Sequence, residues 1–529
     1  MPYKHAIRIA ISLLAFCVVA TGCESQDAHH AAAEHPGTLR IAMTASDIPS
    51  LDTSLTGNQG YEGSRFVGNS LYEGLTRYDL LQSSKIPGVV SSLAESWELA
   101  PSGTQWIFHL RNGVHFTDGT PFNADAVIFN LDRYLNPRAP QYNVSVAGRA
   151  ALSLAGVSGY HAVDEQTVAI DTKGVYSHLP EDLTMVYIAS PTAITKWGAA
   201  FGSHPVGTGP FVFDSMRRGQ QLILRANPNY WRGAPKLQKL VLIPVPDASS
   251  RLAAIRSHSV DWAEAPNPDD IKWLASNGYD VLTNSYDHVW PWIFDVRKKP
   301  LSDVRVRQAL NFAINRNSIA NHLLASTADP ADQVAPRASL AYHGSNDFYD
   351  YDPAKARRLL AEAGYPNGFS MSVSYPTSGS GNMQPGSMNQ AMQADLARIG
   401  VHVNLKPIEW AAMLTSFSSG RIPDEADAIN ISLTFIQEAF WNLLFATGSP
   451  TNIGRYSNPD VDALLAKSAT VVDPGARSAV YAQVSGLLTR DAAWLTAFND
   501  RNPRVLSPAV RGFIQPKSWF VDLTTVSVV

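Results

Sequence analysis

Hydrophobic and polar residues alternate with a period of two in the segment that contains Trp106, Phe108 and Leu110. These three side chains share one face of the segment, as a half-buried β-strand requires. A turn is predicted at 118–121, where the sequence Asp-Gly-Thr-Pro supplies residues that favour tight turns. Asn123 then precedes a run with apolar residues on one helical face, so it is predicted to cap a helix N-terminus.

The rest of the chain shows the same mixture of strand and helix patterns. A later helix is predicted to have Asp352 as its N-cap and Pro353 in its first turn, and to end at Gly364. The 529 residues are too many for one hydrophobic core, so two or three folded units of the α/β class are expected. The other predicted strands are 39–43, 222–226 and 237–246, and the other predicted helices are 249–257, 268–276, 306–314, 392–399 and 461–466.

Composition and charge exclude several classes of protein. Hydrophobic residues make up 45% and charged residues 17% of the chain, as in a soluble globular protein. The net charge of −4 gives no electrostatic reason to bind nucleic acid or an anionic membrane surface.

The N-terminus has the layout of a bacterial export signal. Lys4 and Arg8 precede an apolar stretch at 9–20, which is too short to span a bilayer. The residues that end at Cys23 resemble a lipobox, so 1–23 is predicted to be a lipoprotein signal, with Cys23 the lipidated residue. The alternative is an ordinary cleaved signal that leaves a free thiol. Residues 24–37 are small and polar and are predicted to form a flexible tether.

The sequence lacks the common catalytic motifs. It contains no G-x-S-x-G, no Walker lysine loop, no H-E-x-x-H and no C-x-x-C. Gly207 and Gly209 begin like a dinucleotide fingerprint, but Pro210 follows where a free backbone amide is needed, so a tight turn before a strand is the preferred interpretation. We therefore expect no enzyme, no cofactor and no metal.

Five collinear segments closely resemble solute-binding family 5, the peptide/nickel-type extracellular solute-binding proteins of ABC importers. One segment contains "GTGPF" followed by "NPNYWRGAP", and another contains "DVRVRQALNFAINR". A chance match to one segment is easy, but a match to all five in order is not. The segments are 93–133, 204–213 with 225–235, 294–316, 351–369 and 456–468.

The resemblance implies a periplasmic-binding-protein-like two-lobe fold of type II, cluster C. Its first lobe carries an additional domain, and two crossing segments near 289–296 and 494–499 act as a hinge around a buried ligand. The implied boundaries are 38–75, 206–290 and 495–529 for lobe I, 76–205 for the additional domain, and 291–494 for lobe II.

Ligand-binding residues are expected at strand ends and on aromatic surfaces. Thr44, Ser46 and Tyr61 follow the first strand. Trp290 and Trp292 share one face of a predicted crossing strand, although core packing explains that pattern equally well.

In the second lobe, the resemblance implies cleft contacts from Tyr375 and from Ser432, Thr434 and Gln437. Dipeptide-binding members place an acidic residue near 433–434 for the peptide amine and an Arg near 375–380 for its carboxylate. Neither is present in this sequence. We therefore expect free dipeptides to bind poorly.

The resemblance implies a monomeric receptor in the periplasm or at the cell surface. It is anchored in the membrane through Cys23, binds a small molecule or peptide, and delivers this ligand to ABC permease subunits. A sensing or chaperone-like receptor of the same fold and a nickel-chelate receptor are the alternatives. A secreted hydrolase is disfavoured by the missing motifs.

Overall fold

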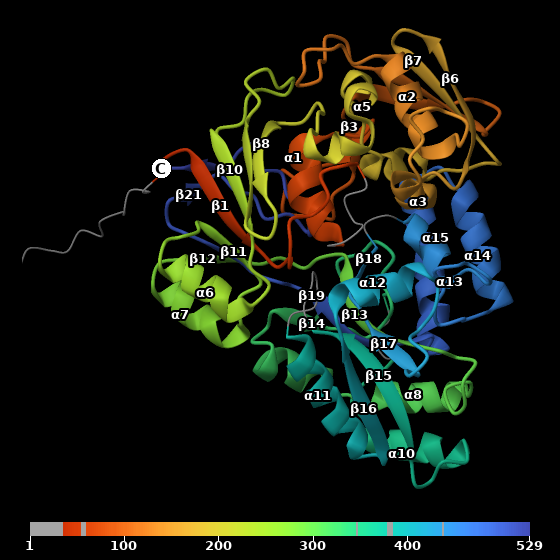
Figure 1. Ribbon diagram of the computed structural model, residues 1–529. Coiled ribbons are helices and arrows are strands. Elements are labelled where there is room, and N and C mark those ends of the chain that lie inside the picture. The colour runs from red at the N-terminus through yellow and green to blue at the C-terminus, as the bar shows by residue number, and fades with distance from the viewer. Residues whose placement is uncertain (1–34, 54–59, 345–347, 378–383, 436–437) are drawn as a thin grey trace, which may run out of the picture.

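The computed structural model describes residues 35–53, 60–344, 348–377, 384–435 and 438–529, and it divides into two lobes with an additional domain (Figure 1). Lobe I is built on a mixed sheet in which β1 runs parallel to β10 and β11. Helix α6 (Ala248–Arg256) packs on β11, and α7 (Ile271–Ser276) packs on β12. The order of the sheet is β12 (Asp280–Leu282), β20 (Arg504–Leu506), β11 (Trp262–Glu264), β1 (Thr38–Met43), β10 (Lys239–Pro244), β9 (Gln221–Ala226) and β8 (Phe211–Arg217).

Lobe II is built on a second sheet, whose order is β14 (Ala328–Pro330), β19 (Trp494–Asp500), β13 (His288–Phe294), β17 (Ala428–Asn430), β15 (Phe369–Pro376) and β16 (Val401–Ile408), with β18 (Leu433–Thr434) paired to β13. Helix α11 packs on β16 and α8 packs on β19. The helices of this lobe are α8 (Val304–Phe312), α9 (Arg316–Ser318), η5 (Ile319–Leu323), α10 (Pro353–Glu362), α11 (Pro385–Ala397), α12 (Trp410–Ser418), α13 (Ala439–Phe445), α14 (Pro459–Thr470) and α15 (Pro474–Arg490).

The additional domain contains an antiparallel sheet in the order β4 (Ala94–Leu99), β5 (Gln105–Leu110), β7 (Thr167–Thr172) and β6 (Val157–Asp164). A hairpin of β2 (Thr76–Tyr78) and β3 (Val89–Ser91) precedes it. The helices here are α2 (Ala124–Leu135), α3 (Val144–Ser153), α4 (Leu179–Asp182), η2 (Leu183–Met185), α5 (Pro191–Trp197) and η3 (Gly198–Ser203). The short elements η1 (Gly63–Gly68), α1 (Asn69–Leu71), η4 (Pro268–Asp270), β21 (Val510–Arg511) and β22 (Ser527–Val528) complete the fold.

The chain passes between the two lobe sheets at 283–287 and again at 501–503. These segments connect β12 to β13 and β19 to β20, so both crossing strands lie wholly in the second sheet. The two connections are bonded to each other, because the Tyr286 hydroxyl donates to the Asn502 carbonyl at 2.8 Å and the Tyr286 amide donates to the Asp500 carbonyl at 3.1 Å. Two short adjacent connections are the geometry of a hinge.

Each part of the fold has its own hydrophobic core. In lobe I, Trp262 is fully buried and packs edge to face on Phe66, with ring centroids 6.3 Å apart. In lobe II, Trp494 packs on Phe445 at 4.5 Å, and in the additional domain Phe108 is fully buried. Burying one such side chain contributes about 1.5–3 kcal/mol, so each core supports its own unit and the units can move as bodies.

Local sequence signals predicted several elements correctly. The alternating segment is β5, whose three apolar residues are buried while the residues between them are partly exposed. Asn123 caps α2 by accepting from the Ala126 amide at 3.0 Å, and Asp352 caps α10 by accepting from the Lys355 amide at 2.8 Å. A Cβ on Gly207 would lie 2.1 Å from the Leu71 carbonyl oxygen, so the turn before β8 requires glycine for close packing.

Candidate ligand-binding site

A cavity of about 700 Å³ lies between the lobes. All three parts of the fold contribute to its wall: Tyr61 and Trp519 come from lobe I, and Ser145 and Gly148 come from α3 of the additional domain. Lobe II supplies the residues around β18, α12 and α13. The volume is within the range of about 300–1,000 Å³ that is typical of small-molecule sites. The lining residues are Gly60, Tyr61, Ser145, Gly148, His288, Trp410, Leu414, Thr415, Phe417, Ser418, Ser419, Ile431, Ser432, Leu433, Thr434, Phe440, Leu443, Leu444, Pro450, Thr451 and Trp519.

The wall of this cavity is apolar and aromatic, with hydroxyl groups placed among the rings. Within the described parts of the chain, the lining contains no Asp, Glu, Lys or Arg. Trp410 has a buried indole Nε1 without a hydrogen-bond partner. Because this nitrogen is buried, Trp410 contributes apolar ring surface to the wall. The cavity is therefore suited to a ligand that offers apolar area and neutral hydrogen-bonding groups.

Aromatic contacts connect the lobes at the cavity. Tyr61 packs edge to face on Phe520 at 5.9 Å and on Phe440 at 6.4 Å. His288 of β13 stacks on Trp519 of the C-terminal segment, with ring centroids 4.7 Å apart. Because Phe440 and His288 belong to lobe II, both contacts bridge the two lobes, and they depend on how the lobes close.

A buried carboxylate fixes the His288–Trp519 pair. Asp500 Oδ2 lies 3.0 Å from His288 Nδ1 and accepts from Trp519 Nε1 at 2.5 Å. Asp500 is fully buried at the end of β19. The side chain of Asp500 therefore positions one polar and one aromatic group of the wall, next to the hinge.

A second carboxylate network supports the same wall from inside lobe I. Glu264 accepts from Arg65 Nη1 at 2.7 Å, from Arg504 Nε at 3.1 Å and from Trp262 Nε1 at 2.6 Å. Arg504 also donates to the Trp519 carbonyl at 2.6 Å. Burial alone raises the pKa of Glu264, but the two guanidinium groups outweigh burial and leave this pKa below its ordinary value.

The structure brings three of the predicted site residues to the cavity: Tyr61, Ser432 and Thr434. Thr434 pairs with β13 and its hydroxyl donates to the Asp287 carbonyl at 3.0 Å, so it faces the cavity from the hinge side. Gln437 and Cys23 lie outside the described residues.

The other predicted residues lie elsewhere. Trp290 and Trp292 are fully buried in the core of lobe II, where Trp292 Nε1 donates to Asn389 at 2.6 Å. Thr44 donates to Glu62 from its amide and its hydroxyl, at 2.8 and 2.7 Å, and so belongs to the lobe I network. Ser46 is exposed and Tyr375 is partly exposed, and neither is among the lining residues.

Sequence reasoning missed most of the aromatic wall. Trp410 begins α12, Phe440 lies on α13 and Trp519 is near the C-terminus. No local pattern distinguishes these rings from core residues, because they meet only after the lobes have folded. The one usable signal was the resemblance, which implicated the segment that contains Phe440.

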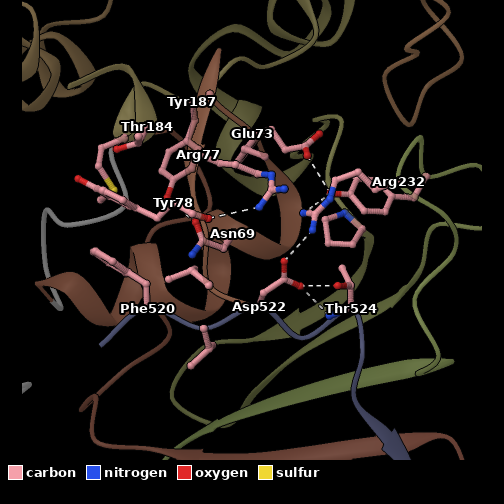
Figure 2. Close-up of a pocket in the computed structure, with 17 residues that line it drawn as sticks. Asn69, Glu73, Arg77, Tyr78, Thr184, Tyr187, Arg232, Phe520, Asp522 and Thr524 are labelled. Atoms are coloured by element: carbon pink, nitrogen blue, oxygen red, sulfur yellow. Dashed lines mark hydrogen bonds and ion pairs between the residues drawn. The ribbon is translucent and has the colours of Figure 1, made fainter. Parts of the chain in front are cut away.

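A second, smaller cavity of about 50 Å³ lies between lobe I and the additional domain (Figure 2). Glu73 accepts from Thr208, Tyr230 and Trp231 at 2.7–2.9 Å. Arg232 pairs with Asp522 at 3.1 Å. The space holds a few waters at most. We interpret it as part of the polar network that joins the C-terminal segment to the additional domain.

Two lobes joined by two short connections, with a cavity of ligand size between them, define the class of bilobal solute-binding proteins. The chain belongs to the bacterial extracellular solute-binding proteins, family 5, because the sequence model of the middle part of that family matches residues 88–442. It is therefore a solute-binding protein of an ABC importer, a carrier of substrate and not an enzyme, as the sequence analysis predicted.

Curated relatives match over most of the chain. Heme-binding protein A of Haemophilus influenzae is 32% identical over 466 residues, which cover 83% of this chain and 84% of the relative. Glutathione-binding protein GsiB of Pectobacterium atrosepticum is 31% identical over 492 residues, which cover 87% and 90%.

Solved structures confirm the predicted fold. The periplasmic binding protein DppA of Helicobacter pylori, in complex with the peptide STSA, superposes with a TM-score of 0.80 at 23% identity, covering 93% of this chain and 98% of that one. A dipeptide-binding protein of Pseudoalteromonas sp. SM9913, in complex with Met-Leu, gives a TM-score of 0.81 at 23% identity, covering 93% and 100%.

Proposed function

We propose that this protein captures a small, predominantly neutral solute in the 700 Å³ cavity and delivers it to an ABC permease. The observation that carries the proposal is the cavity wall, which is formed by both lobes and the additional domain. A ligand that touches all three parts makes its full set of contacts only when the lobes are closed, and so it favours the closed form by its differential affinity.

The ligand class follows from the wall. Relatives bind heme or glutathione, and structural neighbours were crystallised with peptides. Carboxylates and amines on such ligands need buried partners of opposite charge. The described wall offers hydroxyls and one imidazole instead. Capped or modified peptides and other amphipathic solutes without full charges therefore match it best.

The direct test is to purify the mature protein from its host and identify the co-purified ligand by mass spectrometry. We expect that ligand, added back at about 100 times its dissociation constant, to increase the free energy of unfolding by about 2.7 kcal/mol. Small-angle scattering should show a smaller radius of gyration with ligand. Identical radii with and without a saturating ligand would contradict closure.

Two tryptophan variants locate the binding site in the same experiment. Trp410→Ala should weaken binding of the identified ligand at least tenfold, or about 1.4 kcal/mol, because it removes aromatic area from the wall. Trp273→Ala, which changes a tryptophan that is 40% exposed on α7, is the matched control and should bind normally.

We also propose that lipidated Cys23 anchors the protein, with 24–37 as its tether. No helix in the described part of the chain is long and apolar enough to cross a bilayer. Several acyl chains, at about 0.8 kcal/mol per buried methylene, would supply a stable anchor.

Cys23→Ala is expected to release the protein from the membrane. Fractionation followed by a salt wash tests this, with the unmodified chain as control. A variant that stays with the membrane after the wash would rule out the lipid anchor at this residue.

A further inference from the structure

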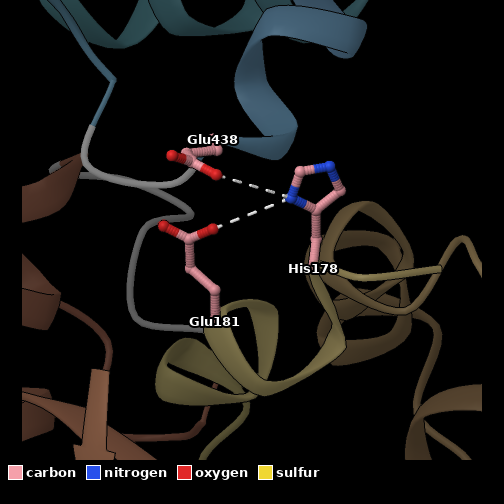
Figure 3. Close-up of side chains that lie close together, drawn as sticks. All are labelled: His178, Glu181 and Glu438. Atoms are coloured by element: carbon pink, nitrogen blue, oxygen red, sulfur yellow. Dashed lines mark ion pairs between the residues drawn. The ribbon is translucent and has the colours of Figure 1, made fainter. Parts of the chain in front are cut away.

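A group of metal-ligating side chains lies where the additional domain meets lobe II, apart from the described lining of the cavity. His178 immediately precedes α4, Glu181 lies within α4, and Glu438 immediately precedes α13. One ligand atom from each of the three residues lies within 4.8 Å of the other two. Figure 3 shows both carboxylates directed toward the same nitrogen of the imidazole ring.

The imidazole of His178 has an unused nitrogen in this group. The side chain is fully buried, its Nε2 lies 3.0 Å from the Tyr481 hydroxyl, and its Nδ1 has no hydrogen-bond partner. Nδ1 lies 3.9 Å from Glu181 Oε2 and 4.0 Å from Glu438 Oε2. These separations are too long for hydrogen bonds.

Glu181 Oε2 is likewise buried without a hydrogen-bond partner. A buried polar atom that is left unsatisfied costs about 1–3 kcal/mol. Two such atoms that face each other across a gap of 3.9 Å indicate that an ion binds between them.

We propose that His178, Glu181 and Glu438 bind a divalent transition-metal cation, zinc being the best match, and that this ion clips the additional domain to lobe II. Nδ1 lies 3.9 and 4.0 Å from the two carboxylate oxygens, and no two of the three atoms are more than 4.8 Å apart, so the point equidistant from them lies at most about 2.5 Å from each, against about 2.0–2.2 Å for zinc bonds to imidazole and carboxylate. A contraction of a few tenths of an ångström, within the reach of side-chain rotation, completes the site.

The donor set selects the type of ion. One imidazole and two carboxylates suit zinc, whereas calcium and magnesium require sites built from oxygen alone. Three protein ligands leave a fourth position for water. Tyr481 supplies the supporting contact, because its hydroxyl oxygen accepts from Nε2–H when Nδ1 carries the metal.

The surrounding charge also favours a cation. Arg477 forms an ion pair with Glu438, and its positive charge also acts on Glu181 and His178. Within the described group, Glu181 and Glu438 share the one guanidinium of Arg477, so the group can accept the charge of a further cation.

The ion would have a structural consequence. The interface already contains a hydrogen bond from the Ser177 amide to the Ala469 carbonyl at 3.0 Å, so the residues just before α4 are in direct contact with lobe II. A metal shared between Glu181 and Glu438 adds bonds that exist only while the two domains are in contact. Zinc should therefore favour the closed arrangement independently of the solute in the cavity.

The experiment uses the mature chain with His29, His30 and His35 changed to Ala, so that the tail cannot bind metal. The protein is stripped with EDTA, dialysed, and titrated with zinc chloride by calorimetry. We expect one equivalent to bind with a dissociation constant of micromolar or below, and to raise the melting temperature. Cobalt chloride should give visible d–d absorption bands that zinc abolishes.

Variants separate this site from others. Glu181→Gln keeps size and packing, and it should weaken zinc binding at least tenfold and remove the cobalt bands, as should His178→Ala. His322→Ala changes an exposed histidine of η5 and should bind as the parent does. Absence of saturable binding in the folded parent, or unchanged binding in both site variants, would overturn the proposal. If His178→Ala fails to fold, Glu181→Gln alone still tests whether the site binds zinc.

Discussion

Glu264→Ala is expected to destabilise the protein by about 3–5 kcal/mol, because it leaves two buried guanidinium groups without their shared carboxylate. Arg65 is 3% exposed, Arg504 is 1% exposed, and Glu264 itself is 3% exposed. Burial already lowers the pKa of Arg65 to about 10, which indicates how strongly this site disfavours an uncompensated charge. The loss also reaches the cavity, because Arg504 holds the Trp519 carbonyl.

Urea unfolding followed by tryptophan fluorescence and circular dichroism measures this effect, and agreement between the two probes checks that one transition is being observed. The matched control is Glu425→Ala, which removes a carboxylate that is 83% exposed and 4.0 Å from Lys406. An exposed pair of this kind contributes about 0–1 kcal/mol. Equal destabilisation by the two variants would contradict the role assigned to the buried network.

The sequence predicted the elements that depend on local chemistry. The caps at Asn123 and Asp352 and the alternating strand at Trp106 are determined by neighbours within a few residues, so they can be read without knowledge of the fold. The two-lobe fold was predicted by a different route, because five ordered segments resemble a family. Neither route required knowledge of a contact between distant residues.

The tryptophans of β13 show the limit of predicting ligand contacts from a hydrophobic pattern. Every residue of this strand is buried, because β19 and β17 pair with it on either side and both of its faces are covered. Alternation therefore carries no information about which face meets a ligand. The predicted ligand role of Trp290 and Trp292 stays a prediction, and the structure places both in the core of lobe II.

The cavity wall could not be predicted from local sequence for a related reason. Tyr61 and Trp519 of lobe I and Trp410 of lobe II are each more than 100 residues apart in the sequence. Their meeting is a property of lobe closure, which no window of sequence encodes. The same holds for His178 and Glu438, which come together only where two domains touch. Sites at domain interfaces are therefore the hardest part of a fold to predict from local sequence.

Free dipeptides are expected to bind weakly, with dissociation constants above about 100 μM, or about −5.5 kcal/mol. A zwitterion needs an acid for its amine and a base for its carboxylate. The described lining of the cavity contains no Asp, Glu, Lys or Arg, and its one imidazole, His288, already lies 3.0 Å from Asp500. Two other acidic residues, which the sequence offers as partners for the amine, are already ion-paired. Glu438 is paired with Arg477, and Asp295 is paired with Arg297 at 2.9 Å. A peptide buried in this cavity would therefore leave both of its charges unpaired, at a cost of several kcal/mol.

Calorimetry with matched peptide pairs tests this expectation. Each free dipeptide is compared with the same side chains capped as an N-acetyl C-amide, so that only the terminal charges differ. Capping should strengthen binding at least tenfold, or about 1.4 kcal/mol, because it replaces two charges with neutral groups that the hydroxyls of the wall can meet. Glutathione, which carries an amine and two carboxylates, should behave like the free dipeptides. A free dipeptide that bound with sub-micromolar affinity and lost it on capping would mean that charged anchors reach the ligand, and that the neutral wall does not set the specificity.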